Sequence, residues 1–116
     1  MILYMIDRHG RARIARFVTD EIARQGLSTR ALGAAYGRPR LPTIKRIKGA
    51  DPDVSETMLR AMGGKLHLPA DWLIYIGTGD VRRIRNSGAE PDLIRVTLDL
   101  FEAQGPNPRW SDRGGS

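Results

Sequence analysis

The chain has 116 residues, enough for one ordinary domain with a small appendage, and 19 Lys or Arg against 13 Asp or Glu give it a formal net charge of +6. It contains no cysteine, which excludes disulfides, Cys-based zinc fingers and thiol nucleophiles, and no apolar run approaches the roughly 20 residues that a membrane span needs. We therefore expect a soluble, cytoplasmic protein without a membrane partner.

The first predicted helix covers residues 11–25. Its apolar residues Ile14, Phe17, Val18 and Ile22 recur at helical intervals, and Gly26 follows as a stop signal. Before it, residues 1–6 predict an arm or short strand, and residues 7–13 predict a basic approach to the helix. That approach is either a DNA-binding arm or a disordered start.

Residues 28–48 predict two short helices joined by a tight basic turn. Ser28 is a good N-cap for the first of them, and Gly37 followed by Pro39 is typical of its end. Pro42 is tolerated in the first turn of the second helix, whose apolar positions Ile44 and Ile47 form one stripe. This hairpin is the central feature of the sequence.

Positive charge is concentrated around the hairpin. Residues 8–48 hold 11 Lys or Arg against Asp20 and Glu21, a net of 11 − 2 = +9, whereas the rest of the chain holds 8 against 11, a net of −3. With the apolar stripe turned inward, Lys45 and Arg46 point outward, and Arg38 and Arg40 lie in the turn. This distribution is typical of a protein that binds a polyanion, and the alternative is a solvated charged face.

Two further helices are expected between residues 55 and 79. Ser55 begins the fourth helix, which Gly63 and Gly64 are expected to interrupt, and Trp72 is a predicted core residue of the fifth. We expect that fifth helix to begin at Pro69 and Ala70 and to end at Gly77 and Gly79.

The remaining chain divides into three parts by composition. Residues 81–88 predict a basic linker, although its arginines could also form a second phosphate contact. Residues 89–104 predict a last helix, with too many apolar residues for one narrow stripe, so it either packs on the bundle or forms a homodimer contact. Residues 105–116 are rich in Gly, Pro and Ser and predict a disordered tail.

The order of Leu32, Gly37, Ile44, Ile47, Gly49 and Leu59, followed by DWLIYIGTGD, resembles the lambda-repressor-like helix-turn-helix family over roughly residues 11–80. The resemblance implies an all-α fold: a five-helix bundle in residues 1–80, with helices two and three as the helix-turn-helix, plus an additional C-terminal helix. The turn is one residue longer than the usual motif and holds two prolines, and Gly33 replaces the common alanine. The resemblance and the charge pattern together predict DNA contacts at Arg30, Arg38, Arg40, Thr43, Lys45, Arg46 and Lys48.

Catalysis finds little support in the sequence. His9 and His67 are the only histidines, and neither has carboxylates at metal-ligand spacing. GTGD at residues 77–80 lacks the GK[ST] ending of a phosphate loop and follows a predicted helix rather than a strand. We expect no enzyme, no cofactor and no metal site.

The function predicted from the sequence is sequence-specific binding of double-stranded DNA for transcriptional repression, of the phage or prophage immunity repressor type. One alternative is the antitoxin of a toxin–antitoxin pair, which would bind its toxin through the C-terminal segment. Another is a non-enzymatic adaptor that binds protein. RNA is a weaker candidate because the deep groove of an A-form duplex does not admit such a helix.

Overall fold

A computed structural model of the chain describes residues 6–104, which form seven helices and no strand. The helices are α1 (Arg8–Arg24), α2 (Thr29–Ala34), α3 (Leu41–Lys48), α4 (Glu56–Lys65), α5 (Trp72–Thr78), α6 (Val81–Arg85) and α7 (Pro91–Gln104). The prediction of an all-α fold is confirmed. The predicted count of five helices plus one is wrong, because residues 81–85 add a further helix.

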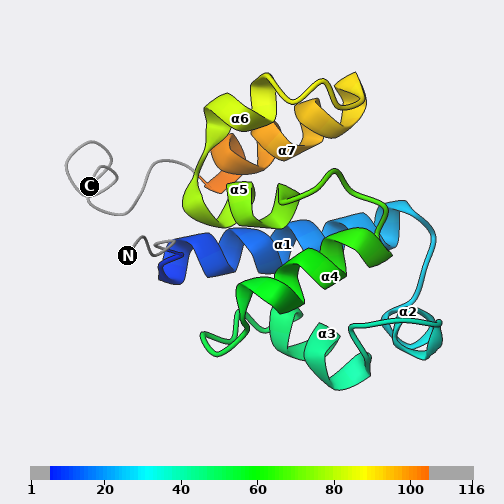
Figure 1. The fold of residues 1–116 in the computed structure, drawn as a ribbon. Coiled ribbons are helices and arrows are strands. Elements are labelled where there is room, and N and C mark those ends of the chain that lie inside the picture. The colour runs from blue at the N-terminus through cyan, green and yellow to red at the C-terminus, as the bar shows by residue number, and fades with distance from the viewer. Residues whose placement is uncertain (1–5, 105–116) are drawn as a thin grey trace.

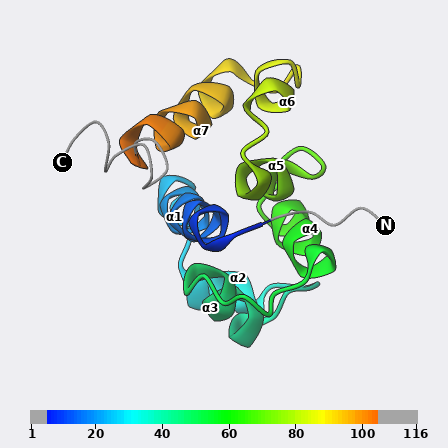
Figure 2. The same cartoon turned by 90° about the vertical axis from the view of Figure 1, so that its left-hand side faces the viewer.

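Helix α1 runs through the middle of the molecule, and the other helices pack around it (Figure 1). Viewed along α1, the pair α2 and α3 lies on one side, α6 and α7 lie on the opposite side, and α4 and α5 connect them (Figure 2). The two most basic segments of the chain, around α3 and in α6, therefore lie at opposite ends of the fold.

The core is a single apolar cluster to which all seven helices contribute. Trp72 is 1% exposed at its centre, and its indole N–H donates to the Thr97 hydroxyl at 3.2 Å, while that hydroxyl donates to the Leu93 carbonyl at 2.7 Å. Because of these two consecutive hydrogen bonds, both the indole N–H and the Thr97 hydroxyl are buried with an acceptor for their proton. The predicted core role of Trp72 is confirmed, and Phe17 of α1 is buried as well, at 4% exposed.

Polar side chains set the start of four helices by accepting a hydrogen bond from a free backbone N–H. They are Asp7, Ser28, Ser55 and Asp80. The Asp7 carboxylate accepts from the Gly10 N–H at 2.8 Å, so α1 begins at Arg8. The expectation that residues 7–13 form an approach outside the first helix is therefore wrong.

Helix α4 continues through both of its glycines, contrary to the predicted interruption. A methyl group on Gly63 or Gly64 would meet nothing within 4 Å, so no close packing requires glycine there. Burial of Leu59 and Met62 on the core side outweighs the unfavourable propensity of the two glycines. His67 lies in the turn after α4, with a φ of 60°.

Helix α5 begins at Trp72, two residues later than Ala70, and it contains Gly77 rather than ending there. A methyl group on Gly10 of α1 would collide with the Gly77 carbonyl, and one on Gly77 would lie 2.7 Å from Ile14 Cδ1. The two glycines thus allow α1 and α5 to cross closely. Gly79, with a φ of 76°, ends the helix as predicted.

Residues 81–88, predicted as a basic linker, include α6, whose only buried side chain, Ile84, joins the core. Helix α7 matches the predicted last helix and packs on α1 and α6. Its Leu93 and Leu100 are buried, so the bundle covers much of its apolar surface.

The predicted N-terminal arm lies largely, and the predicted disordered tail wholly, outside the described residues. Within residues 6–104, none of the helices combines the length and the apolar character needed to cross a bilayer.

Candidate nucleic-acid interface

Helices α2 and α3 form a tightly packed pair. A methyl group on Gly33 would lie 2.7 Å from Leu41 Cβ and 2.8 Å from its Cα, so only glycine permits this approach without a shift. At the other end of the pair, the Lys48 ammonium donates to the Thr29 hydroxyl at 2.7 Å. These contacts fix α3 relative to α2.

Helix α3 has the two faces that its sequence predicts. Ile44 is fully buried and Ile47 is 3% exposed, whereas Lys45 and Arg46 are exposed to solvent. The helix begins at Leu41 after Arg40, whose side chain makes no capping hydrogen bond. The positive end of the helix dipole therefore lies beside Arg40, although Pro42 has no N–H and the Leu41 nitrogen packs against Gly33 of α2.

The structure brings most of the predicted contact residues together on this pair of helices and its turn. Arg30, Arg38, Arg40 and Lys45 are exposed, and no carboxylate of the described residues lies within ion-pair distance of them. Arg46 is also exposed, with its Nε 3.9 Å from Asp51 Oδ2, a surface pair that stabilises little. Thr43 and Lys48 are half-buried.

The sequence around this surface contains no acidic residue from position 22 to position 50, while it holds seven Lys or Arg. Most of the ion pairs of the described chain join arginines to carboxylates elsewhere, on α1, α4, α6 and α7. The positive charge of the α2–α3 pair is therefore largely uncompensated within the protein.

Lys65, the last residue of α4, is a residue of this region that the sequence did not reveal. Its ammonium donates to the carbonyls of Pro39 at 2.7 Å, Gly37 at 2.8 Å and Ala35 at 3.3 Å. Partial burial and the nearby charge of Arg40 lower the pKa of Lys65. No local pattern predicts these contacts, because the lysine lies far along the chain from the turn that it holds.

The turn itself differs in detail from the expectation. Helix α2 ends at Ala34, so Gly37, with a φ of 96°, lies inside the turn and does not cap the helix directly. Pro39 is fully buried, whereas Tyr36 projects into solvent.

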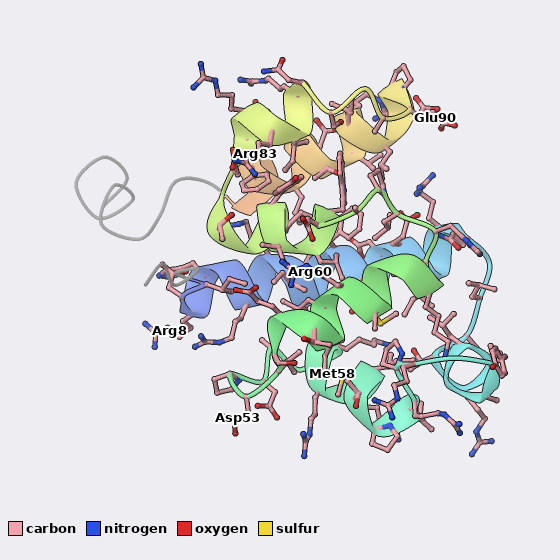
Figure 3. The ribbon with its side chains drawn as sticks, in the orientation of Figure 1. Arg8, Asp53, Met58, Arg60, Arg83 and Glu90 are labelled. Carbon is pink, nitrogen blue, oxygen red and sulfur yellow. The ribbon has the colours of Figure 1, made fainter. Side chains whose placement is uncertain are left out.

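The arginines of α6 do not join this surface. Arg83 lies at the α6 end of the molecule, over α5, with its Nε 3.4 Å from Asp80 and its guanidinium 5.7 Å from the centre of the Tyr75 ring (Figure 3). Arg82 and Arg85 are exposed on the same short helix. A duplex bound along α3 would lie on the far side of the protein from them.

A cavity of about 180 Å³ lies between α1, α3 and α4, on the inner side of α3. Its polar lining consists of Arg11, Asp51 and Glu56. Arg11 Nε is buried there without a hydrogen-bond acceptor among the described residues, although Arg11 Nη1 donates to the Ile6 carbonyl at 3.0 Å. The cavity is smaller than the roughly 300 Å³ at which ligand pockets usually begin. No group of three or more potential metal ligands occurs in residues 6–104.

Comparisons of the chain with known protein families, with curated proteins and with solved structures found no match. Any function assigned to this chain therefore depends on its own residues and their geometry.

Proposed function

We propose that this chain binds double-stranded DNA in a sequence-specific manner and represses transcription, as a phage or prophage immunity repressor does. In this proposal α3 is the recognition helix and enters the major groove. Arg40, Lys45 and Arg46 face base edges and phosphates, while Arg30 and Arg38 bind the flanking backbone.

The observation that carries the proposal is the uncompensated basic surface on a rigid helical pair. The exposed Arg30, Arg38, Arg40 and Lys45 lack carboxylate partners in the described chain, and α3 is fixed from both sides through Gly33 and Lys48. Guanidinium groups match the acceptors of guanine and phosphate, and a rigid helix presents them without a large ordering cost on binding.

The dimensions of α3 fit a groove. With its side chains, an α-helix such as the eight-residue α3 is about 10–12 Å in diameter. The major groove of B-form DNA is about 12 Å wide and admits an α-helix. The N-terminus of α3, which has no side-chain cap, would face a phosphate, where the positive end of its dipole favours an anion.

We interpret α1 to α5 as a bundle of the lambda-repressor-like type, in which α2 and α3 form the helix-turn-helix. The packing of α3 on both α1 and α2 supports this assignment. Helices α6 and α7 would then be additions to the bundle, on the side away from the DNA.

A homodimer through residues 89–104 is part of the proposal. Two half-sites about 34 Å apart would multiply a modest monomer affinity. The side chains that could make this contact are half-buried in the described chain: Ile94, Val96, Leu98 and Phe101. Replacing Leu98 with Glu should dissociate the dimer in sedimentation analysis and lower Tm less than Leu100→Glu does, because Leu98 is half-buried whereas Leu100 is core. A full-length protein that sediments as a monomer on and off DNA would contradict the dimer.

The proposal is tested by removing the same charge at two places. The double variant Arg38→Gln/Arg40→Gln should bind duplex DNA weakly. The slope of its log K against log salt should be shallower by about 1.8, because two phosphate contacts are lost. The control Arg82→Gln/Arg85→Gln loses the same net charge at the opposite end of the fold and should bind like the wild type. Equal losses in both variants would mean that only net charge matters, and unimpaired binding by the Arg38/Arg40 variant would contradict the interface.

A partner other than DNA would show itself in a separate measurement. If the chain is an antitoxin or an adaptor, a protein should bind α7 in place of a second copy of the chain, so the Leu98→Glu variant should lose that protein while its affinity for DNA, which then does not depend on a dimer, stays unchanged.

A further inference from the structure

The turn between α2 and α3, residues 35–40, is held in place by another helix. The Lys65 ammonium donates to the carbonyls of Ala35, Gly37 and Pro39, at alternate positions along the turn. Residues 36–39 make no backbone–backbone hydrogen bond within the described chain. The side chain of Lys65 therefore supplies the order that a turn usually obtains from its own backbone.

The side chains of this ordered turn divide by direction. Pro39 is fully buried against the protein, while Arg38 and Arg40 are exposed. Tyr36 is 103% exposed, so its ring makes almost no contact with the protein. Among the large apolar side chains of residues 6–104, only Leu27, at 40%, is also exposed.

A fully exposed tyrosine on a fixed backbone contributes little to folding. Its ring loses no water on folding, and its hydroxyl makes no hydrogen bond with the described protein. Tyrosine combines a rigid ring with one hydroxyl donor, which makes it a common residue of binding surfaces. Its neighbours in the turn are guanidinium groups, which favour an anionic acceptor as the partner.

We propose that residues 35–40 form a preorganised contact loop for the DNA backbone, in which the Tyr36 hydroxyl and the Arg38 guanidinium donate to phosphate oxygens beside α3. Lys65 is the positioning residue: it does not touch DNA but holds the loop through its three carbonyls. This inference rests on the proposed function and adds to it a contact residue and the means of its positioning.

The first test replaces Tyr36 with Phe, which removes one hydroxyl from a fully exposed side chain and leaves folding unchanged. Loss of a hydrogen bond to a charged group should weaken binding of the selected DNA site about tenfold. The salt slope should not change, because no charge is removed. Tyr75→Phe is the matched control, since Tyr75 lies on α5, away from α3, and it should bind like the wild type.

The second test replaces Lys65 with Met, which keeps the length of the side chain but removes the ammonium. In the free protein, the turn should become more mobile, measured as lower NMR order parameters at the backbone amides of Tyr36, Gly37, Arg38 and Arg40, while those of the helices stay unchanged. Because Lys65 acts through the loop, adding Tyr36→Phe to Lys65→Met should cost less affinity than Tyr36→Phe costs in the wild type.

The outcomes separate the two proposals. If the wild type binds no duplex DNA, both fail, although lower order parameters of the turn in Lys65→Met would still establish that Lys65 holds it. If the wild type binds a specific site and Tyr36→Phe binds equally well, the contact loop alone is refuted. Strictly additive effects of the two substitutions would refute the positioning role of Lys65.

Discussion

The crossing of α2 and α3 predicts that adding a single methyl group at Gly33 will destabilise the protein. In Gly33→Ala the new Cβ would lie 2.7 Å from Leu41 Cβ, 2.8 Å from its Cα and 2.9 Å from its N. Two of these are backbone atoms at the start of α3, which cannot rotate away as a side chain can. The two helices must therefore separate, and overpacking of this kind costs about 1–3 kcal/mol.

Helix propensity acts in the opposite direction. Alanine is more favourable than glycine inside a helix by about 1 kcal/mol, so the close contact must exceed that gain. At 2.7–2.9 Å we take the upper part of the overpacking range and expect Gly33→Ala to be less stable than the wild type by about 1–2 kcal/mol. In a domain of this size, Tm should fall by about 4–8 °C for each kcal/mol.

The matched control is Gly64→Ala. Gly64 lies inside α4 and is exposed, and a methyl group there would meet nothing within 4 Å. This variant should gain about 1 kcal/mol from propensity alone. Urea and thermal unfolding of both variants, followed by circular dichroism, measure the two effects. A Gly33→Ala protein as stable as Gly64→Ala would refute the close crossing, and with it the rigid placement of α3.

Thr97→Val keeps the shape of the side chain but leaves the buried Trp72 indole N–H without its acceptor, so the free energy of unfolding should fall by about 1–3 kcal/mol. The control Thr97→Ser keeps the hydroxyl and should retain the hydrogen bond. An unchanged Tm in Thr97→Val would contradict this prediction. The hydrogen bond from the Gly10 N–H holds the pKa of Asp7 below its ordinary value of 3.8. The stability that Asp7 contributes is therefore present above that value and is lost as the pH falls through the lower pKa of the folded state. Asp7→Asn, whose cap is neutral, should lose less stability between neutral and strongly acidic pH, measured by urea unfolding. Arg46→Ala should cost about 1–3 kcal/mol of binding free energy on the selected DNA site and relax the preference at one base pair. Arg30→Ala should weaken binding to all duplexes alike and reduce the slope of log K against log salt by about one. Equal losses on specific and random DNA in both variants would show that α3 does not read bases.

The elements that local patterns determine were predictable. Ser28 and Ser55 act as N-caps at the expected positions, and the burial of Ile44 and Ile47 follows from their helical spacing. The composition and charge of residues 28–48 likewise placed the exposed arginines of the turn. These features depend on residues within a few positions of one another.

Other features depend on cancelling effects or on distant partners. Helix α6 has one buried residue among three arginines, so its apolar signal is weak, and only Asp80 as an N-cap could have indicated it. Helix α4 continues through Gly63 because packing outweighs propensity. The Lys65 contacts join α4 to a turn that precedes it by more than twenty residues, and nothing in either segment alone indicates them.

The central claim is tested most directly by selecting binding sites from a pool of random duplexes with the full-length chain. The affinity for the selected site is then compared with that for a scrambled duplex of the same composition, at about 0.15 M salt. A sequence-specific repressor should bind its site at least about 10³-fold more tightly than the scrambled duplex. Equal affinities for the two duplexes, or no enrichment during selection, would contradict the account.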